Sequence, residues 1–159
     1  MSVIEITLMV TVVTASFFVG VIAAMLGVIQ RVLNQLDYAT YTQIMQGIIV
    51  AGRKSSIIWA LLLIPLGSAS LTLFLLSSSA NASVFFWMVL GLVLFVVGPI
   101  LVSRFGNEPW YDKIMIWRTD QPMADWERKR MHWFRLNVAR FLIGALSCIA
   151  FAIALAGYH

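Results

Sequence analysis

The chain has 159 residues, of which 61% are hydrophobic and only 11% are charged, and its mean hydropathy is +0.91. This composition excludes a water-soluble domain with a polar exterior and indicates a chain whose main solvent is lipid. The basic pI of about 9.6 arises from Lys and Arg residues that flank apolar runs, so anionic lipid headgroups, and no nucleic acid, are the expected partners. No linker divides the sequence, which predicts one integral membrane domain over residues 1–159.

Four apolar runs predict four transmembrane helices, at residues 6–29, 57–77, 84–102 and 137–158. A helix needs roughly 20 apolar residues to cross the hydrocarbon core, and open strands cannot span lipid. The first run is preceded by Glu5 and is too long for the apolar part of a signal peptide, so we expect it to be retained. The predicted fold class is an all-α bundle of four transmembrane helices.

The positive charges predict the orientation of this bundle. Ten of the eleven Lys and Arg residues lie between the first and second runs or between the third and fourth runs, and Arg140 lies at the near edge of the fourth. The N-terminal residues, the turn at 78–83 and the tail at 157–159 have none. Because positively charged loops stay on the cytoplasmic side, both termini are predicted to be external.

Helices 1, 2 and 4 are expected to extend beyond the membrane on the cytoplasmic side. Residues 40–43 form a Thr-x-x-Gln pattern typical of a capping box, which predicts that the second helix begins near Tyr41 and runs into the membrane. Another helix is expected to begin near Pro122, with Asp125 and Glu127 in its first turns, where the helix dipole favours acids. It is expected to continue through the fourth run because no proline interrupts it.

Small residues in the first three runs predict faces of close helix contact, since such residues let helices approach in lipid. Pro65 and Pro99 can also kink their helices and open a ligand cavity between them, and this alternative stays open. The small residues are Ser16, Gly20, Ala23 and Gly27 in the first run, Gly67, Ser68 and Ser70 in the second, and Gly91 and Gly98 in the third.

One face of the fourth helix carries a polar and aromatic stripe with members three or four residues apart. The stripe consists of Trp126, Arg130, Trp133, Asn137, Arg140, Gly144 and Ser147. Its spacing places Trp126 against Arg130 and predicts a cation–π contact. Asn137 and Arg140 lie where the helix enters the bilayer, and polar groups at that depth usually face the protein interior. In the alternative interpretation, Arg140 reaches the lipid headgroups and the tryptophans form an interfacial belt.

Part of this stripe and two shorter motifs carry a family resemblance. The motif Asn107-Glu108-Pro109, followed by Trp126, Arg130, Trp133, Asn137 and Arg140, resembles the anthrone oxygenase-like family of small four-helix integral membrane proteins. Phe17, Phe18, Gly20 and the pair Met45-Gln46 are similar to its N-terminal half. Most bacterial members of the family have no assigned activity. The chain departs from the family at two positions: Tyr111 replaces the second Asn of the usual Asn-x-Pro-x-Asn, and the usual proline near Gln30 is missing.

The resemblance implies oxygenation of a polycyclic aromatic substrate of the anthrone type, without metal or flavin, in a bacterial inner (cytoplasmic) membrane. Such chemistry needs a base, donors that stabilise the substrate anion, and an apolar pocket. Together with Pro109, the candidate surface for a ligand or partner contains the possible donors Asn107, Arg130, Asn137 and Arg140, and the possible stacking residues Trp110, Trp126 and Trp133. His132 lies off the stripe and is expected to face solvent or headgroups, so no catalytic base is assigned.

Several other chemistries are excluded by the residues present. Cys148 is the only cysteine, which excludes a Cys-x-x-Cys oxidoreductase and an internal disulfide. His132 and His159 are predicted on opposite sides of the membrane, which excludes a pair of haem ligands or a histidine-rich metal site. The alternative function is a non-catalytic accessory or assembly subunit. Its Trp126–Arg140 surface would dock onto a larger membrane complex or a second copy of the chain.

Overall fold

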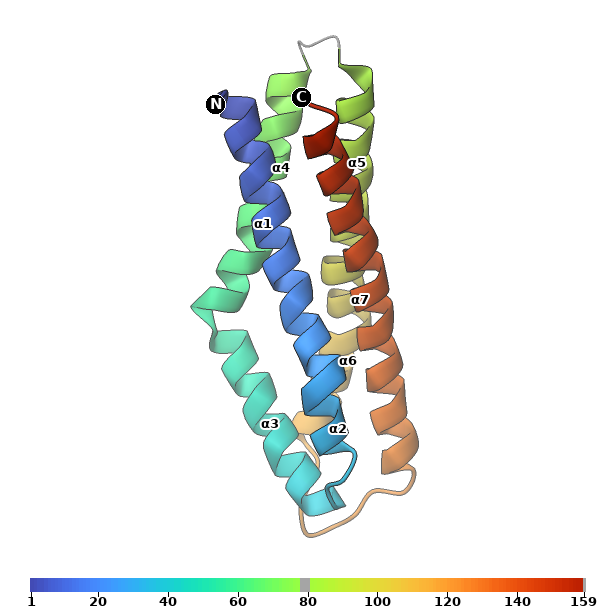
Figure 1. The fold of residues 1–159 in the computed structure, drawn as a ribbon. Helices are drawn as coiled ribbons and strands as arrows, with labels where there is room; N and C mark the ends of the chain where they lie inside the picture. The colour runs from blue at the N-terminus through green and yellow to red at the C-terminus, as the bar shows by residue number, and fades with distance from the viewer. Residues whose placement is uncertain (78–80, 159) are drawn as a thin grey trace.

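The computed structural model describes residues 1–77 and 81–158, and this part of the chain is helical without strands. Four helices are long and apolar enough to cross a membrane: Val3–Leu33, Ser56–Leu76, Ala82–Met115 and Trp126–Ala156. They confirm the predicted all-α bundle with four candidate membrane spans. Both chain termini lie at the same end of the bundle (Figure 1), where the Ser2 and Tyr158 hydroxyl oxygens are 2.9 Å apart. We call this the terminal end.

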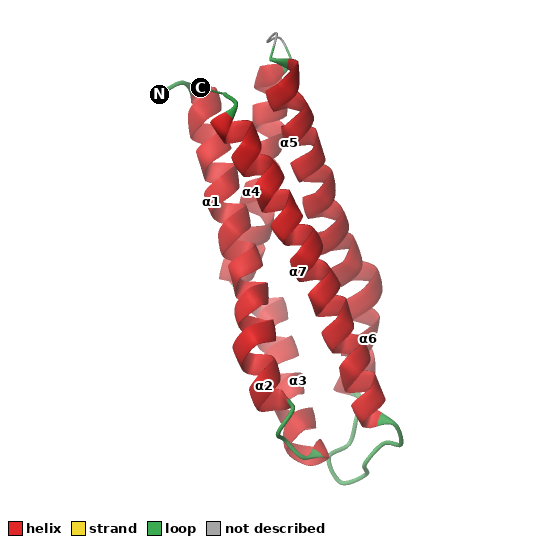
Figure 2. Cartoon of the chain, turned by 45° about the vertical axis from the view of Figure 1, so that its right-hand side comes forward, coloured by secondary structure: helices red, strands yellow, loops and turns green. Residues whose placement is uncertain are grey.

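The long helices contain several segments. In chain order the elements are α1 (Val3–Ala24), η1 (Met25–Ile29), α2 (Gln30–Leu33), α3 (Tyr38–Lys54), α4 (Ser56–Leu76), α5 (Ala82–Phe95), η2 (Val96–Asn107), α6 (Glu108–Met115) and α7 (Trp126–Ala156). The η segments are π-helical turns, which continue the first and third long helices with a wider backbone. Figure 2 shows the loops at the far end of the molecule, between α2 and α3 and between α6 and α7. We call this the basic end.

Hydrogen bonds between side chains join α1 to α4 in the terminal half of the bundle. The Thr11 hydroxyl donates to Ser68 at 2.8 Å, and the Thr72 hydroxyl donates to Thr7 at the same distance. Such bonds between membrane helices contribute about 0.6 kcal/mol each on average. They lie within an apolar core cluster that α1, α4, α5 and α7 share, and this cluster fixes the four helices relative to one another.

Glycines allow close contact between the third long helix and α7, as predicted. A Cβ atom added at Gly91 would lie 2.5 Å from the Phe151 ring, and one added at Gly98 would lie 2.8 Å from Ile143. The Ser147 hydroxyl also donates to the Gly91 carbonyl at 2.8 Å. Neither glycine has room for a side chain, so this helix pair depends on both.

Most of the small residues predicted to form contact faces on the first and second helices are exposed. In α1 and η1, Ser16, Gly20 and Gly27 are exposed, and a Cβ atom at either glycine would meet nothing within 4 Å. The prediction of a contact face is wrong at Gly20 and Gly27, while Ser16 contacts the Cys148 thiol of α7. The buried threonines of α1 face α4. In α4, Gly67 and Ser70 are also exposed, and only Ser68 of the predicted group makes an interhelical contact.

The second helix is not continuous, which corrects the prediction that it begins near Tyr41 and runs into the membrane. It divides into α3 and α4 at Ser55, whose backbone is extended and whose hydroxyl accepts the Ile58 N–H at 3.3 Å. The start of α3 also differs from the predicted capping box, since Asp37 and not Thr40 is its N-cap residue. Figure 1 shows that the α3–α4 junction bends away from the other helices.

The Asp37 cap predicts a pH-dependent contribution to stability. The Asp37 carboxylate accepts the Thr40 backbone N–H at 2.9 Å and the Thr40 hydroxyl at 3.0 Å, which holds the pKa of Asp37 below its usual value of 3.8. Since the folded-state pKa is lowered, the contribution is present above about pH 4 and is lost as the pH falls through that pKa. We expect the difference in melting temperature between the wild type and Asp37→Ala to shrink in acid. Circular dichroism in detergent would measure it, and a difference independent of pH would contradict the prediction.

The last helix begins later than predicted. Pro122 lies in the preceding loop, and α7 starts at Trp126 after Asp125, which has a φ of 62°. Aspartate tolerates this left-handed conformation better than most residues, and its carboxylate accepts an Arg128 N–H at 2.6 Å. The left-handed residue turns the chain sharply, so the helix cannot extend back to Pro122. It then runs unbroken to Ala156.

Candidate functional site

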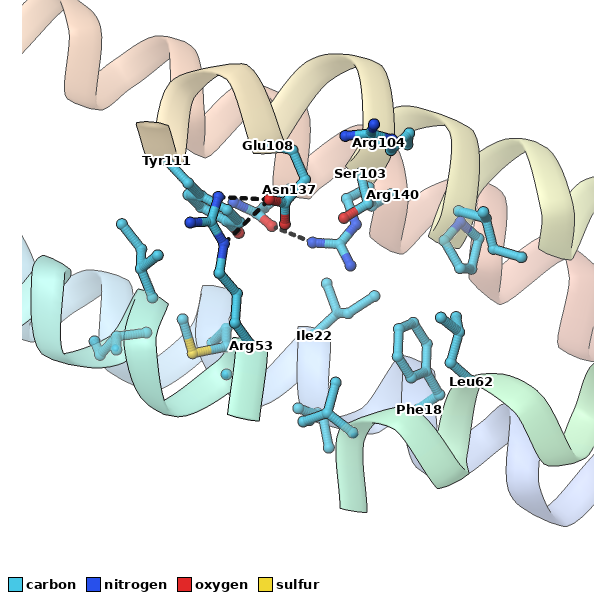
Figure 3. Close-up of a pocket in the computed structure, with 18 of the residues that line it drawn as sticks. Phe18, Ile22, Arg53, Leu62, Ser103, Arg104, Glu108, Tyr111, Asn137 and Arg140 are labelled. Atoms are coloured by element: carbon cyan, nitrogen blue, oxygen red, sulfur yellow. Dashed lines mark hydrogen bonds and ion pairs between the residues drawn. The ribbon is translucent and has the colours of Figure 1, made fainter. Parts of the chain in front are cut away.

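A cavity of about 520 Å³ lies between α1, the α3–α4 junction, η2 and α7 (Figure 3). Ligand pockets for small molecules typically enclose about 300–1,000 Å³ and are mostly apolar. The lining includes the apolar side chains of Phe18, Ile22, Met45, Ile49 and Leu62. Pro99 borders the cavity while Pro65 does not, so the space does not lie between the two prolines; it lies at the break in the second helix.

Polar side chains from η2, α6 and α7 form one side of this cavity. Arg140 donates from Nη1 to Asn137 Oδ1 at 3.1 Å, and Asn107 donates to the same oxygen at 3.3 Å. The Asn137 amide nitrogen in turn donates to the Trp133 carbonyl at 3.0 Å. These bonds fix the orientation of Asn137 and attach the Arg140 guanidinium to it.

The Arg140 guanidinium has an unused donor. Figure 3 shows this group extending into the space between α7 and α1, and its Nε is buried with no hydrogen-bond partner in the described part of the chain. The buried Oδ1 atom of Asn107 and Nε1 atom of Trp133 also lack partners there. Buried polar atoms are usually satisfied because leaving one unpaired costs about 1–3 kcal/mol.

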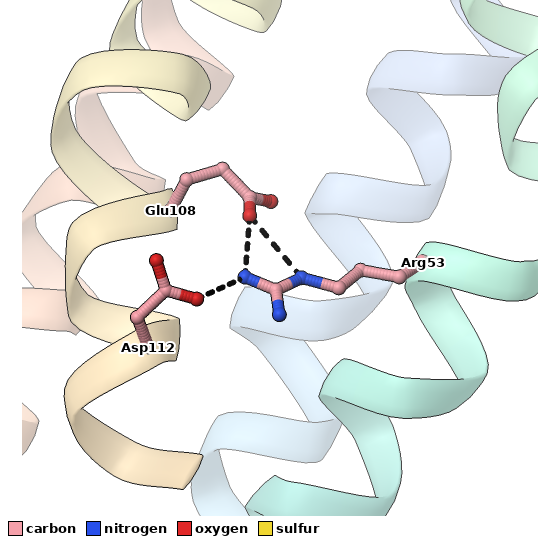
Figure 4. Close-up of polar contacts among 3 residues, drawn as sticks. All are labelled: Arg53, Glu108 and Asp112. Atoms are coloured by element: carbon pink, nitrogen blue, oxygen red, sulfur yellow. Dashed lines mark hydrogen bonds and ion pairs between the residues drawn. The ribbon is translucent and has the colours of Figure 1, made fainter.

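An ion-pair cluster connects α3 to α6 beside the cavity (Figure 4). Arg53 Nη2 lies 2.6 Å from Glu108 Oε2 and 2.8 Å from Asp112 Oδ1. The hydrogen bonds to Asp112 and Glu108 raise the pKa of Arg53. Gln46 strengthens the same junction by donating to the Ile114 carbonyl at 3.0 Å. The cluster therefore ties the last turn of α3 to the third long helix.

A separate aromatic cluster occupies the basic end. The Arg130 guanidinium carbon lies 4.8 Å from the centre of the Trp126 ring, which confirms the predicted cation–π contact, and 5.8 Å from the Tyr41 ring. Trp126 also contacts Tyr38 and Tyr41, and burial raises the pKa of Tyr41. Trp126 and Arg130 do not line the cavity, so they attach α7 to α3 instead.

The predicted site residues therefore fall into three groups. The α7 stripe faces inward, with Trp133, Asn137, Gly144 and Ser147 buried, so the alternative of an interfacial tryptophan belt is wrong for Trp133. Three of the predicted residues line the cavity: Trp133, Asn137 and Arg140. Asn107 does not line the cavity but donates a hydrogen bond to Asn137. Trp126 and Arg130 belong to the aromatic cluster.

Pro109 and Trp110 lie apart from the cavity. Pro109 is exposed at the start of α6. The Trp110 ring is 4.9 Å from the ring of His132 and 4.8 Å from the Lys113 ammonium group. His132 is exposed and does not border the cavity, as expected. His159 lies outside the described residues, so its separation from His132 stays a prediction.

The cavity also contains residues that the sequence did not single out as site residues. Arg53, Glu108 and Tyr111 all line it, and Tyr111 occupies the motif position that has Asn in the family resemblance. In the described part of the chain, no group of three or more His, Cys, Asp or Glu residues is placed to hold a metal ion. The polar chemistry of the cavity therefore comes from guanidinium, amide, phenol and carboxylate groups.

Comparisons with known proteins give no match: no protein-family model, no curated protein and no solved structure is similar to this chain. The fold and the cavity themselves define the class of protein. It is a four-helix integral membrane protein with a mostly apolar cavity that is lined by a partly buried arginine.

Proposed function

We propose that this protein is a small membrane enzyme that oxygenates an anthrone-type aromatic substrate with O₂, without metal or flavin. The observation that carries the proposal is the Arg140–Asn137 pair at the edge of an apolar cavity. The apolar lining suits fused aromatic rings, and Arg140 suits an oxygen atom on those rings that gains negative charge. The sequence resemblance supplies the choice of reaction.

Stabilisation of an anion is the main contribution expected from the site. An anthrone becomes reactive toward O₂ when its methylene carbon loses a proton and the charge spreads onto the ring oxygen as an enolate. Charge-assisted hydrogen bonds are roughly twice as strong as neutral ones and act more strongly away from water. The Arg140 guanidinium extends into the cavity and can bind that oxygen, while its bond to Asn137 fixes its position.

The overall reaction balances with O₂ as the only oxidant. The carbanion transfers electrons to O₂ and a carbon–oxygen bond forms, giving a hydroperoxide after uptake of a proton. Loss of water from that hydroperoxide breaks the O–O bond and leaves a carbonyl group. One oxygen atom enters the quinone, the other leaves as water, and the methylene carbon is oxidised by four electrons.

We also propose that the protein lies in a bacterial inner membrane with both termini external. All eleven Lys and Arg residues lie in α2, α3, η2, α6, α7 or the segment before α7, and α1, α4 and α5 have none. Positive charge of this kind favours the cytoplasmic side. Under this orientation α2, α3 and the first turns of α7 extend into the cytoplasm, and the cavity lies toward the inner leaflet.

Anthrone itself provides a direct test. The purified protein in detergent should bind anthrone with quenching of tryptophan fluorescence, because Trp133 lines the cavity. It should also accelerate formation of anthraquinone, with one O₂ consumed per quinone, as followed by absorbance and an oxygen electrode. The heat-unfolded protein corrects for spontaneous oxidation. Binding without quinone formation would overturn the oxygenase assignment, and absence of binding would overturn the choice of substrate class as well.

The second candidate function is a non-catalytic subunit of a larger membrane complex. One observation favours it: the neighbouring apolar residues Met115 and Ile116, at the end of the third long helix, are 37% and 77% exposed, and contiguous exposed apolar surface marks protein interaction sites. Purification of the tagged protein from its native membrane would test this function. Stoichiometric recovery of other membrane proteins would support it, and recovery of the protein alone would contradict it.

A further inference from the structure

Glu108 is the only acid among the residues that line the cavity. It is the first residue of α6, directly after the π-helical segment that contains Asn107. Its side chain is 29% exposed, so it faces the cavity and is not enclosed in the packed core. Figure 3 places Glu108 beside Asn137 and Tyr111, on the side of the cavity that also carries Arg140.

The two carboxylate oxygens of Glu108 have different surroundings. Oε2 accepts two hydrogen bonds from Arg53, from Nε at 3.2 Å and from Nη2 at 2.6 Å (Figure 4). Oε1 accepts no hydrogen bond from any residue that the structure describes. One oxygen therefore holds the carboxylate in place while the other is available to a bound molecule.

Arg53 has a second carboxylate partner in Asp112. Arg53 also donates to Asp112 Oδ1 at 2.8 Å, and Asp112 is 71% exposed. If Glu108 takes up a proton, Arg53 keeps one anionic partner that water already solvates. The Arg53 guanidinium therefore keeps an anionic partner throughout. Leaving its charge unpaired beside the apolar cavity would be costly.

We propose that Glu108 is the catalytic base, and this inference rests on the proposed function. Glu108 Oε1 takes a proton from the methylene carbon of the anthrone. The carbon–hydrogen bond breaks, the proton forms a bond to Oε1, and the electron pair stays on the ring system as an enolate. Arg140 binds the enolate oxygen. Glu108 and Arg140 line the same side of one cavity, so base and anion-stabilising donor can act on one ring system.

Deuterium exchange tests this step separately from oxidation. Without O₂ and in D₂O buffer, the protein should accelerate replacement of the methylene hydrogens of anthrone by deuterium, as measured by mass spectrometry. Glu108→Gln should still bind anthrone, because glutamine can accept the Arg53 hydrogen bonds, but exchange should fall by roughly 100-fold or more. Asp112→Asn is the matched control. It removes the other carboxylate partner of Arg53 but no residue of the cavity lining, so exchange should persist.

The outcomes distinguish the inference from the function on which it rests. Failure of the wild type to bind anthrone overturns the proposed function. Binding with equal exchange in the wild type and Glu108→Gln overturns the role of Glu108 alone, as does an equal loss of exchange in Glu108→Gln and Asp112→Asn. If Glu108→Gln does not fold, Glu108→Asp retains the acid but shortens its reach. It should reduce exchange, whereas Asp112→Glu should not, and equal exchange in these two variants overturns the assignment.

Discussion

Arg140→Ala should weaken binding of anthrone to the cavity by roughly 10- to 100-fold, because a hydrogen bond to a charged group contributes about 1.5–3 kcal/mol. The substitution removes the guanidinium that extends into the cavity. Asn137 Oδ1 keeps its bond from Asn107, so the remaining polar contacts should stay in place. Titration of tryptophan fluorescence with anthrone, in the absence of O₂, measures the change in Kd.

Arg135→Ala is the matched control for this prediction. Arg135 lies on the same helix, is exposed and does not line the cavity. The substitution changes the net charge of the protein by the same amount as Arg140→Ala does. Equal weakening in both variants would show that overall charge and not the cavity controls binding, and unchanged binding in Arg140→Ala would remove the basis of the proposed anion site.

Gly98→Ala should destabilise the bundle by about 1–3 kcal/mol, as overpacking of a close contact commonly does. The new Cβ atom would lie 2.8 Å from Ile143 Cβ and 3.3 Å from the Gly144 backbone nitrogen. Neither atom belongs to the free end of a flexible side chain, so η2 and α7 would have to move apart. Unfolding in mixed detergent micelles with increasing sodium dodecyl sulfate, followed by circular dichroism, measures the loss.

Gly67→Ala separates this contact from the effect of alanine on the helix itself. Gly67 lies within α4, and an added Cβ atom there would meet nothing within 4 Å. Alanine is favoured over glycine in a helix by about 1 kcal/mol, so Gly67→Ala should be neutral or stabilising. If the two variants unfold at the same detergent composition, close approach at Gly98 does not hold the helices together.

Hydropathy was sufficient to predict the number of membrane spans but not which face of each helix is buried. The apolar side chains of α1 give no clear difference between the sides facing lipid and protein, and the stripe of small residues at Gly20 and Gly27 suggested the wrong one. The polar residues Thr7 and Thr11 were better markers, because their hydroxyls bond to α4. The break at Ser55 was missed because no proline marks it and Gly52, in the last turn of α3, was not recognised as a sign of a helix end.

Site residues could be predicted from the sequence only where a polar side chain stands within an apolar run. Asn137 and Arg140 were expected to face inward because unpaired polar groups are costly in a membrane, and their contacts agree. Glu108 was seen only as part of a motif. Its surroundings depend on Arg53, which is 55 positions away in the sequence and is placed by the bend between α3 and α4. Spacing within one helix cannot reveal such a long-range pair.

The contacts that hold the helices together and the cavity lie in different halves of the bundle. The threonine–serine bonds and the contact at Gly91 lie toward the terminal end, whereas the open space lies beside the α3–α4 junction. Lining residues such as Ile48 and Ile49 lie outside the apolar core cluster of the four helices, so changes to them leave these contacts intact. In evolution, substitutions near the junction can therefore reshape the cavity while the contacts that hold the bundle together in the bilayer remain the same.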